Sequence, residues 1–196
     1  MPSPRTGIMG GTFDPVHVGH LVAAVCVRHA LDLDRVLVVV ANRPWQKEKD
    51  RTVTPAEARF EVVSSAVEGV VGVEASRIEI DRGGPSYTAD TVTELKDRVG
   101  GELFLIVGGD LVSELETWDR VNEVKRETTL VVVQRGGVPI APDPEGWTVQ
   151  RVEMPVIDLS SSELRARFRD GRPVDFLIPK PAIDCIRRLG LYSVGR

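Results

Sequence analysis

The sequence predicts an α/β fold built on a mostly parallel β-sheet. Short apolar runs rich in β-branched residues recur along the chain, and segments with the helical spacing of apolar residues lie between several of them. Strands that alternate with helices usually pair in parallel, because each helix carries the chain back to the starting edge of the sheet. The expected strands are 6–9, 36–41, 73–80, 103–107, 130–133 and 149–152.

Two of the expected helices begin at recognisable capping patterns. Segment 54–57 (TPAE) places Thr54 at the N-cap, a proline in the first turn and a glutamate at the third helical position, and segment 160–163 (SSSE) repeats the box. The pair Asp170–Gly171 is expected to end the second of these helices. A basic loop at 42–52 and a glycine- and proline-rich loop at 136–146 complete the outline, and the first is the better functional candidate because its positive charge follows a strand directly.

Length, composition and charge restrict the class of protein. The 196 residues, of which 42% are hydrophobic and 28% charged, fit one soluble domain, so we expect a single domain over 1–196. The net charge of -4 gives no overall basic field. We therefore expect no nucleic-acid partner, and any anionic ligand must be held by local charges and backbone donors.

The sequence shows neither a membrane span nor a disulfide pattern. No apolar run approaches the roughly 18 residues that a membrane helix needs, and no charged-then-apolar leader is visible, so we expect a cytoplasmic protein without a membrane partner. Cys26 and Cys185 lie far apart in segments with helical spacing. We expect both to be small buried side chains.

The first strand runs into a glycine turn and then an apolar helix over 21–31. The turn and the helix start read GGTFDPVHVGH over 10–20. Glycines let the backbone approach a ligand closely, and unpaired N–H groups at a helix start attract an anion. His17 and His20 face the same side if both lie in the first helical turn. This layout predicts a phosphate-binding site.

Two imidazoles beside a triphosphate suit phosphoryl transfer, which needs positioning and charge stabilisation more than covalent chemistry. The alternative for a histidine at a helix start is a capping or core residue, but the pair, the double glycine and the proline argue jointly for a ligand site. The spacing matches neither the dinucleotide fingerprint G-x-G-x-x-G nor a Walker A loop. Zinc held by His17, His20 and Asp14 is a further alternative. No H-E-x-x-H motif or cysteine pair supports it, and we expect no resident metal.

Two distant segments resemble the nucleotide-binding signature of the adenylyltransferase and cytidylyltransferase superfamily. They are GGTFDPVHVGHL at 10–21 and LSSSELR at 159–165, which is similar to the superfamily's I-S-S-T-x-I-R segment. Taken alone, the serines are equally well explained as a capping box. Further segments resemble the bacterial nicotinate-nucleotide adenylyltransferase family in the same order along the chain. These are PWQK at 44–47, DRGGPSYTADT at 81–91, GGD at 108–110 followed by Trp118, LIP at 177–179 and LY at 191–192.

The resemblance implies a Rossmann-like, doubly wound fold with helices on both faces of the sheet, in one nucleotidyltransferase domain whose helical part at about 160–196 carries the serine motif. It implies transfer of AMP from ATP, bound with magnesium, to nicotinate mononucleotide, giving nicotinate adenine dinucleotide and pyrophosphate in NAD biosynthesis. The expected partners are those two nucleotides, and the protein is a monomer or a homo-oligomer. Nicotinamide mononucleotide and phosphopantetheine remain alternative acceptors, and a nucleotide-binding regulator without turnover is a further alternative.

The resemblance also implies roles for individual residues. The catalytic residues are His17, His20 and Arg165. The ATP-binding residues are Gly10, Gly11, Thr12, Phe13, Lys47, Gly108, Asp110, Arg135, Ser161 and Ser162. The nicotinate nucleotide is bound by Tyr87, Thr88, Trp118 and Asp119, with the ring stacked on the tryptophan and its carboxylate held by backbone N–H groups at a helix start. A turn leading to an N-cap at Thr88 and a packing role for Trp118 are compatible alternatives.

Three positions depart from the pattern of that family. Gln46 stands where a histidine is common, and segment 174–176 (VDF) lacks an arginine that is often present. Gly136 replaces the usual proline after Arg135. These departures concern local phosphate contacts and leave the motifs that carry the chemistry intact.

Overall fold

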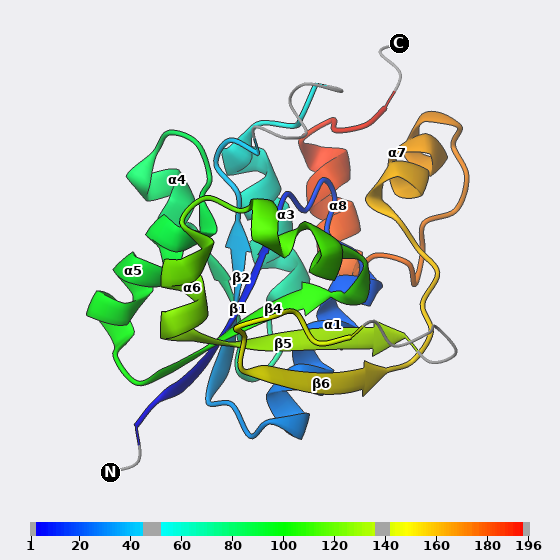
Figure 1. The fold of residues 1–196 in the computed structure, drawn as a ribbon. Helices are drawn as coiled ribbons and strands as arrows, with labels where there is room; N and C mark the ends of the chain where they lie inside the picture. Colours follow the sequence, from blue (N-terminus) through cyan, green and yellow to red (C-terminus); the bar gives the residue numbers. More distant parts are fainter. Residues whose placement is uncertain (1–2, 45–51, 136–141, 194–196) are drawn as a thin grey trace.

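Six parallel strands form one sheet in the order β3-β2-β1-β4-β5-β6 (Figure 1). The structure, a computed structural model, describes residues 3–44, 52–135 and 142–193. The strands are β1 (Arg5–Gly11), β2 (Arg35–Val40), β3 (Val73–Ser76), β4 (Glu102–Gly108), β5 (Thr128–Arg135) and β6 (Val149–Met154). Each strand pairs in parallel with its neighbours. The chain winds outward from β1 in both directions, which confirms the expected Rossmann-like, doubly wound α/β fold.

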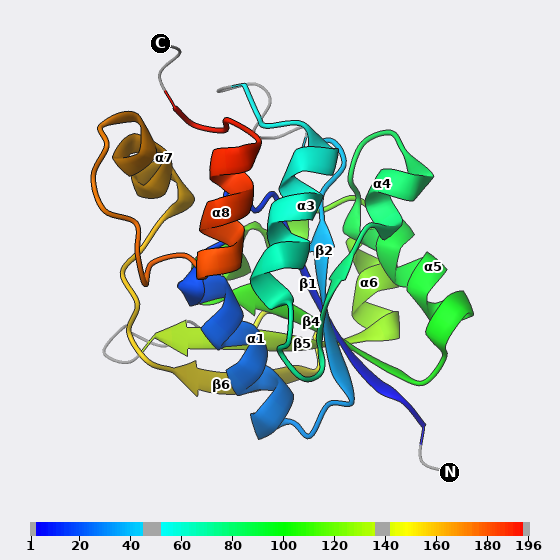
Figure 2. The same ribbon diagram turned by 180° about the vertical axis from the view of Figure 1, so that it is seen from behind.

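Helices cover both faces of this sheet, as the front and back views show (Figures 1 and 2). One face carries α1 (Val18–Ala30), α3 (Ala56–Val67), α7 (Ser161–Arg169) and α8 (Lys180–Arg188). The other carries α4 (Ile78–Arg82), α5 (Thr88–Val99), the 3-10 helix η1 (Gly109–Thr117) and α6 (Val121–Glu127). Along β2, Val36, Val38 and Val40 enter the first core, whereas Leu37 and Val39 enter the second. Burial on both faces explains why the central strands β2, β4 and β5 contain unbroken apolar runs.

The strand expected at 73–80 is wrong in its second half. Strand β3 ends at Ser76, and α4 begins at Ile78. The apolar positions change phase between the two elements, from Val73 and Ala75 to Ile78 and Ile80. A single strand keeps one alternation along its length, so this change of phase marks the end of the strand.

The two capping predictions have different outcomes. Helix α3 has Pro55 rather than Thr54 as its N-cap, so that prediction is wrong. Ser160 does cap α7, because its Oγ accepts the backbone N–H of Glu163 at 3.2 Å. The same helix ends at the expected pair, with Asp170 as C-cap and Gly171 at φ 66°.

The C-terminal helices belong to the same hydrophobic core as the N-terminal half. Leu164 of α7 and Ile183 and Ile186 of α8 are buried in one cluster with residues of α1, β1 and α3. Cys185 is buried as expected, whereas Cys26 is only half-buried. Within the described residues, no helix has the length and apolar character needed to cross a membrane.

Candidate active site

The glycine turn lies at the carboxyl end of β1, where the order of the sheet reverses. β1 pairs with β2 on one side and with β4 on the other. In open α/β sheets, ligands bind in the crevice at such a switch point. Gly10 and Gly11 end β1, and Gly108 ends β4 immediately before η1. Three of the expected ATP-binding residues therefore lie at two adjacent strand ends, and a fourth, Asp110, lies in the first turn of η1.

The two glycines of the turn have different surroundings. A Cβ atom on Gly11 would lie 2.8 Å from Cζ of Phe13, whose ring is buried beneath the turn with its backbone at φ 49°. A Cβ atom on Gly10 would meet nothing within 4 Å. Gly11 is therefore required by the packing of the protein itself, whereas the space beside Gly10 is open to a ligand.

This difference gives a test of the nucleotide assignment. Gly10→Ala should leave the melting temperature unchanged but raise the KM for ATP about tenfold, because the added methyl group occupies the space proposed for the nucleotide. Gly11→Ala is the matched variant and should lower the free energy of unfolding by about 1 kcal/mol or more. Thermal unfolding and initial rates measure both effects. Normal ATP affinity in Gly10→Ala would exclude Gly10 from the nucleotide site.

The two histidines lie together at the start of α1. His17 is the N-cap, His20 is the third helical residue, and their rings stack with centroids 3.7 Å apart. The backbone N–H of His17 donates to Nδ1 of His20 at 3.2 Å, as part of a capping box. Because Nδ1 accepts this bond, the neutral ring carries its proton on Nε2, and that nitrogen is a hydrogen-bond donor. The expectation that both rings face one side is confirmed, and a capping role accompanies it.

The helix start is less open than the sequence suggested. The N–H of Val18 donates to the carbonyl of Leu177 at 3.0 Å, and the N–H of His20 donates to the carbonyl of His17 at 3.0 Å. The expectation that the first N–H groups of α1 are all unpaired is therefore wrong. Two of the first three N–H groups of α1 thus have partners within the protein.

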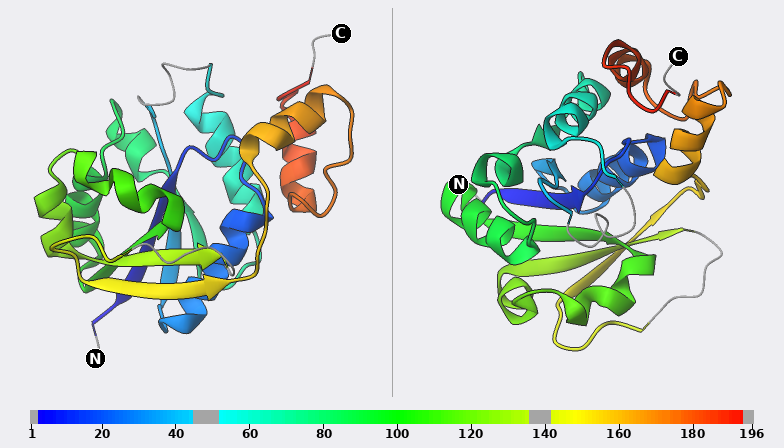
Figure 3. Two further views of the ribbon diagram at one scale, coloured as in Figure 1. Left: turned by 45° about the vertical axis from the view of Figure 1, so that its right-hand side comes forward. Right: turned by 90° about the horizontal axis from the view of Figure 1, so that it is seen from above.

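Residues of α7, far along the chain, donate hydrogen bonds to the backbone of the glycine turn. Nη1 of Arg165 donates to the carbonyl of Asp14 at 2.7 Å, and Oγ of Ser161 donates to the carbonyl of Pro15 at 2.8 Å. Nη2 of Arg165 also donates to Oγ of Ser162 at 3.0 Å. Figure 3 shows α7 beside the loop that follows β1. The structure thus brings the histidine and serine motifs together.

Tyr192 contributes a further bond to this turn. Its hydroxyl donates to Oδ1 of Asp14 at 2.7 Å, and only 1% of Asp14 is exposed. Burial, followed by the Asp14 carboxylate, raises the pKa of the Tyr192 hydroxyl. The hydroxyl therefore remains a hydrogen-bond donor at neutral pH.

Arg59 is a site residue that motif reasoning missed. It is 1% exposed, and its guanidinium donates to the carbonyls of Thr12 at 2.7 Å, Thr54 at 2.7 Å and Asn42 at 3.2 Å. The sequence does carry a signal. Arg59 precedes Val62, Val63, Ala66 and Val67 at the spacing of a buried helix face, where an arginine must have partners.

The segment proposed for the nicotinate nucleotide is bound to the end of β2. The N–H of Asn42 donates to Oγ of Ser86 at 2.9 Å, and Nδ2 of Asn42 donates to the carbonyl of Gly84 at 2.8 Å. The N–H of Ser86 donates to the carbonyl of Arg43 at 3.1 Å. Tyr87, which is half-buried, is the N-cap of α5, and Thr88 is its first helical residue, so the alternative that placed the N-cap at Thr88 is wrong by one position.

Trp118 and Asp119 lie beside the first turn of the same helix. Trp118 is half-buried against the second core at the end of η1. The next residue but one, Arg120, pairs with Asp119 at 2.7 Å and with Asp90 of α5, and these hydrogen bonds raise the pKa of its guanidinium. Arg120 thereby ties the Trp118 turn to the helix that Thr88 begins.

The structure gives only part of the information on several expected site residues. Lys47 and the departures at Gln46 and Gly136 lie outside the described residues. Arg135 is the last residue of β5, and its side chain is not among those the structure describes. At Gly108, a Cβ atom would meet Oδ1 of Asp110, so a side chain there would displace the Asp110 carboxylate.

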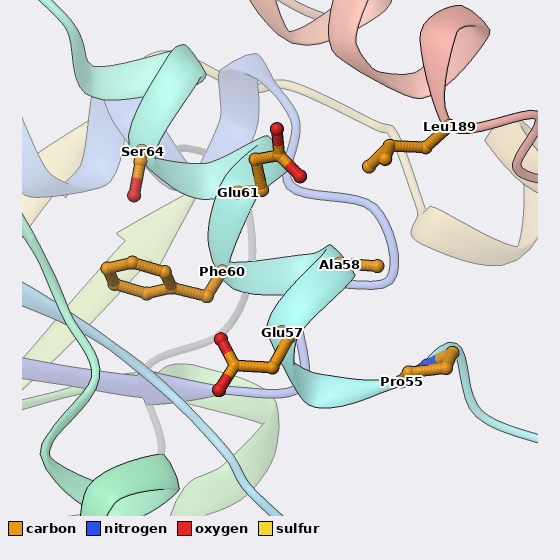
Figure 4. Close-up of a pocket in the computed structure, with 7 residues that line it drawn as sticks. All are labelled: Pro55, Glu57, Ala58, Phe60, Glu61, Ser64 and Leu189. Atoms are coloured by element: carbon orange, nitrogen blue, oxygen red, sulfur yellow. The ribbon is translucent and has the colours of Figure 1, made fainter.

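A hollow of about 600 Å³ lies elsewhere, on the outer face of α3 (Figure 4). It is lined by Pro55, Glu57, Ala58, Phe60, Glu61, Ser64 and Leu189. Its two carboxylates, those of Glu57 and Glu61, pair with Arg77 and Arg188, whereas Arg59 of the same helix is directed inward toward the glycine turn. Among the described residues, no group of three or more His, Cys, Asp or Glu side chains is arranged to hold a metal ion.

Known proteins resemble this chain along most of its length. The family described as cytidylyltransferase-like matches residues 8–167. A protein of Corynebacterium kroppenstedtii named "Probable nicotinate-nucleotide adenylyltransferase" is 45% identical over 193 residues, covering 96% of this chain and 91% of its own. The chain belongs to the nicotinate-nucleotide adenylyltransferase family. A protein of Thermus thermophilus with the same name is 41% identical over 189 residues, covering 96% of this chain and 99% of its own.

Solved structures share the fold of this nicotinate-nucleotide adenylyltransferase family member. The nicotinic acid mononucleotide adenylyltransferase of Plasmodium falciparum, in complex with NaAD, has a TM-score of 0.78 at 18% identity, covering 96% of this chain and 97% of its own. The same protein complexed with APC has a TM-score of 0.75, with 95% and 96% covered. At this identity the likeness concerns the fold, and the sequence relatives establish the family.

Proposed function

We propose that this protein transfers AMP from ATP to nicotinate mononucleotide, forming nicotinate adenine dinucleotide and pyrophosphate in NAD biosynthesis. The observation that carries the proposal is the stacked pair His17 and His20 beside an open glycine, on a turn held by Ser161 and Arg165. Such a site suits a nucleoside triphosphate. The names of the relatives support the choice of acceptor.

The reaction is a direct displacement. A phosphate oxygen of the acceptor attacks the α-phosphorus of ATP, the bond from that phosphorus to the bridging oxygen breaks, and pyrophosphate leaves with the electron pair. Holding two reactants in line can lower the barrier by about 7 to 11 kcal/mol, and no covalent enzyme intermediate is needed. We propose that His17, His20 and Arg165 act on the phosphates, and that Nε2–H of His20 donates to the negative charge that develops there.

ATP binds together with a divalent cation. We propose that this cation is magnesium, bound to the ATP phosphates as part of the substrate. The ATP subsite would comprise Gly10, Gly11, Thr12, Phe13, Lys47, Gly108, Asp110, Arg135, Ser161 and Ser162. The open space beside Gly10 supports this placement. The position of Gly108 at the end of β4, which pairs with β1, supports it as well.

The acceptor would bind between the start of α5 and the Trp118 turn. Residues Tyr87, Thr88, Trp118 and Asp119 form this proposed subsite. A twelve-residue helix begins at Thr88, and the positive end of its dipole favours the carboxylate of the nicotinate ring. The flat face of Trp118 suits stacking against that ring.

We further propose that 1–196 acts as a single nucleotidyltransferase domain. The shared core of α1, α3, α7 and α8 supports this, because the C-terminal helices contribute buried residues to the same cluster as β1. The contacts of Ser161 and Arg165 with the glycine turn support it too.

The test is pyrophosphate release from magnesium ATP with nicotinate mononucleotide, nicotinamide mononucleotide and phosphopantetheine supplied separately. We expect strong preference for nicotinate mononucleotide, and His20→Ala serves as the control for contaminating activity. Preference for either of the other two acceptors would replace the proposed substrate. If none of the three acceptors supports pyrophosphate release while ATP still binds, a nucleotide-binding regulator would be favoured.

A further inference from the structure

We infer that Arg59 is a positioning residue that couples the binding of the two substrates. The inference rests on the proposed function, because it connects the segment assigned to ATP with the segment assigned to the acceptor. Arg59 has no place in the motifs that identify the family in this sequence, and it is among the largest fully buried side chains of the described chain.

The first step of the argument is the position of the guanidinium. The backbone ladder between β1 and β2 ends where the N–H of Ala41 donates to the carbonyl of Gly11 at 2.9 Å. Immediately beyond, the carbonyl of Thr12 accepts from Nη1 of Arg59 and that of Asn42 accepts from Nη2, at 2.7 and 3.2 Å. Arg59 therefore continues the connection between the two strand ends where backbone pairing stops.

The connection extends to the acceptor segment. Asn42, whose carbonyl Arg59 holds, donates through its side-chain amide to Gly84 and through its backbone N–H to Ser86. Ser86 directly precedes Tyr87, the N-cap of α5. A continuous series of hydrogen bonds thus runs from Thr12 through Arg59 and Asn42 to the start of the proposed acceptor subsite, without passing through either substrate.

The chemistry of the guanidinium makes this series stiff. Arg59 uses three nitrogens of one rigid plane to bond three carbonyls from separate segments, the third being that of Thr54. A buried carbonyl that loses its donor is costly, so the three segments have to keep their relative positions. An ammonium group presents one point of charge and cannot span the same three acceptors. A ligand that orders either strand end therefore orders the other.

The expected result is positive coupling between the substrates. Calorimetric titration of the full chain with an α,β-methylene analogue of ATP, alone and with saturating nicotinate mononucleotide, measures it directly. In the unaltered protein we expect the acceptor to tighten binding of the analogue by about fivefold or more, the lower end of typical coupling between sites. In Arg59→Lys the factor should fall below about twofold, even where the protein remains folded.

Two further variants separate this role from general support of the fold. Asn42→Ala removes the side-chain hydrogen bond to the carbonyl of Gly84 and leaves Arg59 in place. This variant should also reduce the coupling. It keeps the inference testable if Arg59→Lys fails to fold. Ser65→Ala is the matched control, because it removes one hydrogen bond from the same helix α3, that from Oγ of Ser65 to the carbonyl of Glu61, and leaves the bonds of Arg59 and Asn42 in place. It should leave the coupling factor unchanged.

The outcomes are distinct. Full coupling in both Arg59→Lys and Asn42→Ala, or an equal loss in Ser65→Ala, would overturn the inference while leaving the proposed function intact. If both ligands bind to the unaltered protein without any coupling, the inference about Arg59 would be overturned and the proposed function would stand. Failure of nicotinate mononucleotide to bind or react at all would contradict the proposed function, and this inference with it.

Discussion

Replacing His20 by alanine should lower kcat by about a hundredfold to a thousandfold while the protein remains folded. The reason is the orientation of the ring. Its Nδ1 accepts the backbone N–H of His17, so the neutral ring is protonated on Nε2, and we propose that Nε2–H donates to charge that develops on the phosphates. Steady-state rates and circular dichroism of the purified variant measure the two parts of this prediction.

His20→Gln is the control that separates catalysis from capping. Glutamine at the third helical position can accept the N-cap backbone N–H, so this variant should retain the stability that His20→Ala loses, about 0.5 to 2 kcal/mol. We expect its kcat to remain as low as that of His20→Ala. A kcat near that of the unaltered protein in His20→Gln would show that His20 only caps the helix and would remove it from the mechanism.

Trp118→Ala should weaken binding of nicotinate mononucleotide by roughly 5- to 150-fold, the range expected for loss of one aromatic stacking partner. The KM for ATP should change far less, because Trp118 lies at the end of η1 beside α5 rather than at the glycine turn. Separate titrations of the two substrates at saturating partner concentration give both constants.

Trp118→Phe tests whether the aromatic face is what matters. It keeps a ring at the half-buried position and should recover most of the affinity for the acceptor. Thermal unfolding of both variants is needed as well, since Trp118 also packs against the second core. Equal increases in the KM of ATP and of the acceptor would contradict the stacking assignment and indicate a structural role for the tryptophan.

The sheet could be predicted from the sequence because its strands are buried on both faces. Val36 to Val40 reads as one apolar run, and the structure divides its side chains between two cores. Where the pattern was read without regard to phase, the prediction failed, as at the boundary between Ser76 and Ile78. The cap at Thr54 failed for another reason: the N-cap is Pro55, and the Thr54 carbonyl accepts Nε of Arg59.

The site was predictable only where a motif carries it. The spacing of His17 and His20 was enough to predict that the rings lie together, and the structure confirms this. Motif matching gave no role to Arg59, because its partners are backbone carbonyls and backbone carries no sequence pattern. The detail that Val18 donates to Leu177 was equally out of reach, since it depends on how the segment before α8 packs on α1.

The hydrogen bonds that hold the glycine turn also bear on the order in which the protein folds. The bond from Arg165 to Asp14 closes 151 residues of chain, and that from Tyr192 to the same residue closes 178. Contacts so far apart in sequence carry a large loop-closure entropy and form slowly. During synthesis from the N-terminus, β1 and its turn exist long before Arg165 and Tyr192 have been made. We therefore expect the nascent chain to gain its nucleotide site abruptly and late, when its last helices dock on its first strand.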